Sequence, residues 1–80
     1  MTAAAKILAK MRNNPMGWRI EDLKTVAARF KIEHRQPGTS HVTFRHPSGA
    51  KLTVPARKPI KPIYVKKFLE LIDEVTDEED

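Results

Sequence analysis

The chain has 80 residues, 40% of them hydrophobic, and its 15 Lys and Arg exceed its 10 Asp and Glu by five. A chain this short buries only about 60% of the surface of its unfolded form, which excludes a deep substrate pocket and a large cofactor. It has no cysteine and no apolar run near the roughly 20 residues that span a bilayer, and its first residues are too charged for a secretory signal, so we expect a cytoplasmic protein without disulfides.

Two helices are predicted at the start of the chain. The first can be capped by Thr2 and ends before Pro15. Its apolar face is formed by Ile7, Leu8 and Met11. The second begins at Arg19 or Ile20. Its apolar residues recur at steps of three and four, the mark of one buried face, and they are Ile20, Leu23, Val26, Ala27 and Phe30.

Three short strands follow, because the apolar period changes to two. They are predicted over residues 31–35, 41–46 and 50–55, and the short connections between them favour an antiparallel meander. The alternation turns Val42, Phe44, Leu52 and Val54 toward the core. It turns the polar and basic residues to the other face, namely His41, Thr43, Arg45, Lys51 and Thr53.

A last helix is predicted to start at Pro62, which suits the first turn. Its apolar stripe consists of Tyr64 or Val65, Phe68, Leu71 or Ile72, and Val75. We expect residues 76–80 to be an acidic tail that frays into solvent. The order predicts an α+β fold in which the second and third helices cover one sheet face and leave the basic face open.

The charge is distributed unevenly. Seven of the ten acids lie in residues 70–80, so residues 1–69 carry 15 − 3 = +12. Such an excess on a small body is expected of a protein that contacts nucleic acid, although solubility alone also explains a charged surface.

Several motifs occur together in this order. They are GTSHVTF (38–44), HPSG (46–49), LTVP (52–55) and a basic, proline-containing loop into the last helix (57–67). With them, residues 20–75 resemble the HicA family of bacterial toxins. The match has departures, because the family turn is commonly Gly-Ser-His and Thr39 lengthens it here. Phe30-Lys31 also stands where many members have Gly-Trp.

The resemblance implies a fold like that of double-stranded-RNA-binding domains, α-β-β-β-α with a three-stranded antiparallel sheet. The chain would then comprise an N-terminal helical extension (1–17), the toxin domain (18–75) and the acidic tail (76–80). It also implies a metal-independent endoribonuclease that cleaves mRNA, uses no cofactor and has His41 as its catalytic residue. The partner would be a HicB-type antitoxin that covers the active site. On physical grounds, we expect this partner to present an acidic surface that complements the basic surface around His41.

The chemistry of a histidine fits such a role. Histidine titrates near neutral pH and can take the proton of a ribose 2′-hydroxyl, which then attacks the adjacent phosphate. One acid–base group typically contributes about 10²–10⁴-fold, and nearby cations stabilise the developing charge. An activated water would use the same residues, so the nucleophile stays open at this point.

Other polar residues are candidates for RNA contact. They are Ser40, Thr43, Arg45, Lys51, Lys58, Lys61, Lys66 and Lys67. Ser40 has no acidic neighbour that would build a nucleophilic triad, so a turn or phosphate hydrogen bond is expected. His46 is expected to cap a backbone group in its turn, with a second acid–base role as the alternative. His34 is expected to be structural. The spacing of the three histidines places them on different strands and turns, with no supporting carboxylate motif, and no metal is predicted.

Two further features have competing interpretations. Trp18 is expected to fasten the N-terminal extension to the second helix, although it could stack a base. The acidic tail is expected to be a solubilising end, or else to lie across the basic face and compete with RNA. The main alternative function is a non-catalytic RNA-binding module of the same fold. A protein-interaction adaptor would need an exposed apolar patch, which the pattern does not show.

Overall fold

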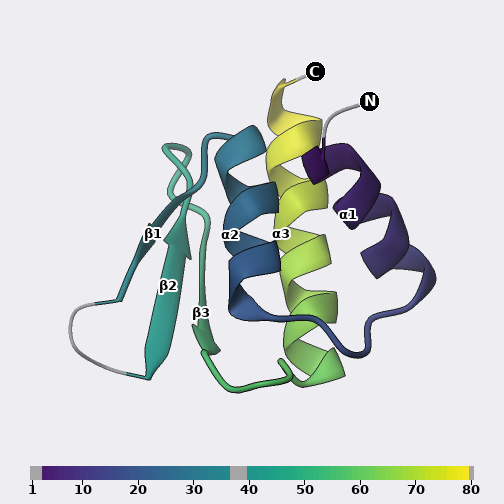
Figure 1. Cartoon of the computed structure of the whole chain (residues 1–80). Coiled ribbons are helices and arrows are strands. Elements are labelled where there is room, and N and C mark those ends of the chain that lie inside the picture. Colours follow the sequence, from purple (N-terminus) through teal and green to yellow (C-terminus); the bar gives the residue numbers. More distant parts are fainter. Residues whose placement is uncertain (1–2, 37–39, 80) are drawn as a thin grey trace.

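The computed structural model describes residues 3–36 and 40–79, and side chains as far as residue 76 (Figure 1). It contains six elements: α1 (Ala3–Asn13), α2 (Ile20–Arg29), β1 (Glu33–Arg35), β2 (His41–Arg45), β3 (Lys51–Pro55) and α3 (Pro62–Glu79). The predicted α+β fold is confirmed: α-β-β-β-α, preceded by an extra helix. The expected cap Thr2 and the turn residues 37–39 lie outside the described residues.

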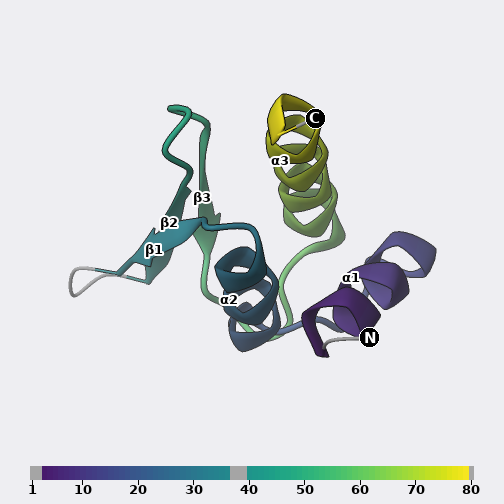
Figure 2. The same ribbon diagram turned by 90° about the horizontal axis from the view of Figure 1, so that it is seen from above.

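The three strands form an antiparallel sheet in the order β1-β2-β3. The β2–β3 turn is closed by hydrogen bonds from the His46 amide to the Ala50 carbonyl and from the Gly49 amide to the His46 carbonyl, each 2.9 Å. Gly49 has a φ of 101°, a conformation that side chains disfavour, so glycine is needed there. Figure 2 shows all three helices on one side of the sheet, which leaves the other side uncovered.

One core joins the helices to the inner face of the sheet. In this core, the ring centroids of Phe44 on β2 and Phe68 on α3 are 5.2 Å apart. Met11 of α1 is fully buried in the same core, and an ion pair of 2.6 Å links Arg12 to Asp73 of α3. The N-terminal helix is therefore packed into the fold. The fully buried side chains are Met11, Leu23, Val26, Ala27, Val42, Phe44, Val54, Ile60, Val65, Phe68, Ile72 and Val75.

Two element boundaries differ from the prediction by more than one residue. The first strand, expected over 31–35, begins at Glu33 because Lys31 and Ile32 close the end of α2. There the amides of Ile32 and Lys31 donate to the carbonyls of Ala27 and Ala28, and Lys31 takes a left-handed φ of 61°. The last helix continues to Glu79, where fraying was expected, because no proline or glycine interrupts it.

Among the described residues, no helix is long and apolar enough to cross a membrane.

Candidate active site

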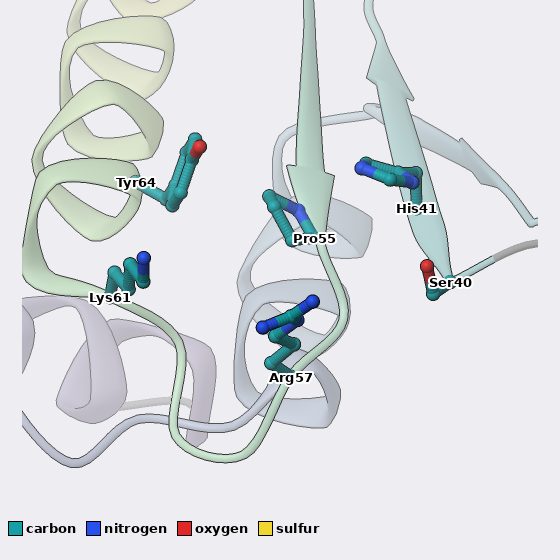
Figure 3. Close-up of a pocket in the computed structure, with 6 residues that line it drawn as sticks. All are labelled: Ser40, His41, Pro55, Arg57, Lys61 and Tyr64. Atoms are coloured by element: carbon teal, nitrogen blue, oxygen red, sulfur yellow. The ribbon is translucent and has the colours of Figure 1, made fainter.

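A small open cavity of about 240 Å³ lies where β2 begins, β3 ends and α3 starts (Figure 3). Its lining consists of Ser40, His41, Pro55, Arg57, Lys61 and Tyr64. Three of the predicted residues, Ser40, His41 and Lys61, thus meet here. Figure 3 shows the His41 imidazole and the Tyr64 ring on opposite sides of Pro55, with Arg57 and Lys61 bordering the same space.

The sheet register places His41 at this cavity. His41 pairs with Pro55, the last residue of β3, so its side chain stands at the end of the hairpin and not over the middle of the sheet. Just beyond this last strand pair, the Ala56 amide donates to the Ser40 carbonyl over 2.6 Å. This bond fixes the chain that leaves β3 beside the start of β2, and so holds Arg57 near His41.

The start of α3 supplies the other wall. Ile60 is buried, and its amide donates to the Trp18 carbonyl over 2.8 Å, which anchors the loop after β3. The Lys61 carbonyl then accepts the amides of Tyr64 and Val65 and opens the helix. Lys61 and Tyr64 therefore sit at the N-terminal end of an 18-residue helix, where the helix dipole adds positive potential to that of the cations.

The remaining predicted contacts lie away from this cavity. Arg45 borders a hollow with Glu33 and His46, and Lys51 and Lys67 border another with Glu70 and Glu74. Lys58 and Lys66 are exposed and do not line the His41 cavity. The hydroxyls of Thr43 and Thr53 bond each other over 3.1 Å on the uncovered face of the sheet.

The other two histidines have visible structural contacts. His46 is 8% exposed, and its Nδ1 accepts the Ser48 amide over 3.1 Å, which confirms the predicted turn cap. The His34 ring lies 6.5 Å from that of Phe44. Within the described part of the chain, no group of three or more His, Asp and Glu side chains could hold a metal ion.

Trp18 also has a structural place. Its half-buried ring packs against the core, and its indole N–H donates to the Asn14 carbonyl over 2.7 Å. The bond closes the connection between α1 and α2. Together with the Ile60 contact, it links that connection to the loop before α3.

Sequence reasoning did not assign Arg57 and Tyr64 to the site. Arg57 comes two residues after Pro55, the strand partner of His41, so it could be assigned only once the register of the hairpin was known. Tyr64 was one of two candidates for the apolar stripe, and Val65 fills that role with no exposed surface. The polar tip of a tyrosine favours the boundary of a core, which is the signal that was available.

Comparisons with protein-family models, with curated proteins and with solved structures find no match for this chain. The chemistry of the site therefore has to be judged from its own geometry. An imidazole, a guanidinium, an ammonium and a helix N-terminus border one open cavity. Such a set can bind a phosphodiester, move a proton and stabilise negative charge.

Proposed function

We propose that this protein is a metal-independent endoribonuclease with His41 as its general acid–base residue. The observation that supports this most directly is the cavity that His41 shares with Arg57 and Lys61. A proton-transfer group and two phosphate-binding cations beside an open surface are what RNA cleavage needs. The substrate itself supplies the nucleophile, its 2′-hydroxyl.

The reaction proceeds as an in-line transfer. Neutral His41 removes the 2′-hydroxyl proton, and the 2′-oxygen forms a bond to phosphorus as the bond to the 5′-oxygen breaks. The leaving 5′-oxygen takes a proton from a charged donor or from water. Arg57 and Lys61 hold the phosphate and stabilise the charge that develops on its oxygens. The products are a 2′,3′-cyclic phosphate and a 5′-hydroxyl.

The resemblance to HicA toxins supports a more specific role. In this proposal the protein is the toxin of a type II toxin–antitoxin system, acts on mRNA in the cytoplasm and is held inactive by a HicB-type antitoxin. The cations around His41 favour a partner that presents carboxylates to this cavity.

Single-turnover cleavage of an end-labelled RNA in excess EDTA tests the enzyme. We expect the unsubstituted protein to cleave and His41→Ala to lose about 10²–10⁴-fold. His34→Ala is the matched control, since His34 is also an exposed strand histidine but does not line the cavity. Circular dichroism and RNA binding show whether each variant is folded and still holds substrate.

The same experiment distinguishes the proposed enzyme from the second candidate function, a non-catalytic RNA-binding module. The uncovered basic sheet face favours that reading as well. Binding without cleavage by the unsubstituted protein would support the module and overturn the enzyme. Cleavage that requires added metal would overturn the proposed chemistry.

A further inference from the structure

The uncovered face of the sheet carries side chains beyond those of the core and of the His41 cavity. The register of β1 on β2 puts Glu33 beside Arg45 and Arg35 beside Thr43, on the face that β2 shares with His41. The register of β2 on β3 adds the pairs Thr43–Thr53 and Arg45–Lys51 to that face. We call these residues the outer face: Glu33, Arg35, His41, Thr43, Arg45, Lys51, Thr53 and Pro55.

One pair on the outer face is unfavourable in the isolated protein. Arg45 and Lys51 are both exposed and stand directly opposite each other, where Cβ atoms are about 4.5–5.5 Å apart and like charges are destabilising. Glu33 lies on the other side of Arg45, and Glu70 and Glu74 border a hollow with Lys51, but in the described part of the chain none of these acids forms an ion pair with Arg45 or Lys51. A bound polyanion would relieve this repulsion.

The outer face is continuous with the cavity. Along β2, four residue steps separate His41 from Arg45, about 13 Å at 3.3 Å per residue. The strand register places Thr43, Thr53 and Arg35 in this interval, and the two threonine hydroxyls bond each other there. A nucleic-acid strand carries one negative phosphate per nucleotide, so an interval of this length can contact more than one phosphate.

The width of the outer face favours one strand of nucleic acid. Three strands about 4.8 Å apart make a surface about 10 Å wide. Duplex-RNA modules instead reach across two successive minor grooves, over about 16 base pairs. The outer face has no Phe, Tyr or Trp on which bases could stack, whereas Tyr64 lines the cavity itself.

Building on the proposed function, we propose that substrate RNA lies as a single strand across the outer face, from the Arg45–Lys51 pair to the His41 cavity. Its phosphates contact Arg45, Lys51 and Arg35, and the base next to the cleaved bond stacks on Tyr64. Recognition along the outer face is then through the backbone and tolerates many sequences.

The test measures binding of a short labelled single-stranded RNA and of its duplex, at several salt concentrations, in the His41→Ala background. Arg45→Gln/Lys51→Gln removes two outer-face charges. Lys6→Gln/Lys10→Gln removes two exposed charges from α1 and is the matched control. Each phosphate contact to a single strand contributes about 0.7 to the slope of log affinity against log salt, so the outer-face pair should lower the slope by about 1.4.

We expect the control pair to leave the slope unchanged and the parent protein to prefer single strand over duplex. The path across the outer face would be overturned if both double variants lowered the slope equally, or if the parent protein bound duplex and single strand with equal affinity. If the parent binds neither RNA, the proposed function fails as well. If the unsubstituted protein cleaves RNA but the outer-face pair changes nothing, only the path is wrong.

Discussion

The two faces of the sheet are made from alternate residues of the same strands, yet they meet opposite demands. Val42 and Phe44 are fully buried against the helices, whereas their neighbours His41 and Arg45 are exposed. The inner face is constrained by packing, and its residues are explained by stability alone. The outer face is free of that constraint, and the proposed binding and catalysis would account for the cations and the imidazole placed there.

The largest effect is expected from the inner face. Phe44→Ala removes the ring that packs on Phe68 and should lower the free energy of unfolding by about 3–5 kcal/mol. That is a large part of the roughly 5–15 kcal/mol that stabilises a domain, so most activity would be lost through unfolding. Urea denaturation measures the free energy of unfolding. A loss as small as that of Thr43→Ala, its outer-face neighbour, would contradict the contrast between the faces.

The cavity should show the reverse pattern. Arg57→Gln or Lys61→Gln should slow single-turnover cleavage about 10- to 100-fold, since hydrogen bonds to charged groups contribute about 1.5–3 kcal/mol. Both side chains are exposed, so the stability should change by less than about 0.5 kcal/mol. Lys58→Gln, next to Arg57 but outside the cavity lining, is the control. Equal slowing by all three variants would show that only overall charge matters.

A comparison of two histidines sharpens the account. His46→Ala removes the acceptor of the Ser48 amide and should cost about 1 kcal/mol of stability. The cleavage rate of the folded protein should be unchanged, because His46 does not line the cavity with His41. Thermal unfolding and single-turnover rates measure the two quantities separately. A rate loss like that of His41→Ala would assign His46 to the chemistry.

The smallest predicted effect is a gain in stability. Lys31 has a left-handed φ of 61°, which costs a side chain about 1–2 kcal/mol, and glycine avoids this cost at an entropic penalty of about 0.5–1 kcal/mol. Lys31→Gly should therefore stabilise by about 0.5–1 kcal/mol in urea denaturation. Lys24→Gly, inside α2, should instead destabilise by about 1 kcal/mol. If both variants destabilise, the turn at the end of α2 is not strained.

Much of the fold could be predicted because each element has its own period. The alternation along His41–Arg45 assigned each side chain to its face, and Pro62 marked the first residue of α3. The start of β1 could not be predicted, because Lys31 is an unusual residue for the left-handed position that ends a helix. Glycine there would have marked the boundary.

The site was only partly predictable, because it joins segments that are distant in sequence. His41 and Ser40 stood out by their motif. Arg57 reaches the same cavity through the pairing of β2 with β3, and Tyr64 through the packing of α3. A one-dimensional pattern gives neither the register nor the helix rotation, so these two residues required the folded chain.

The measurement that tests the central claim most directly is the identity of the RNA ends after cleavage in EDTA. Mass spectrometry should find a 2′,3′-cyclic phosphate and a 5′-hydroxyl with the unsubstituted protein, and with His41→Ala the same products should form about 10²–10⁴-fold more slowly. Those ends require the ribose hydroxyl as nucleophile, and the loss of rate in His41→Ala would assign the proton transfer to His41. A 3′-hydroxyl with a 5′-phosphate, or products that form at an unchanged rate in His41→Ala, would contradict the account.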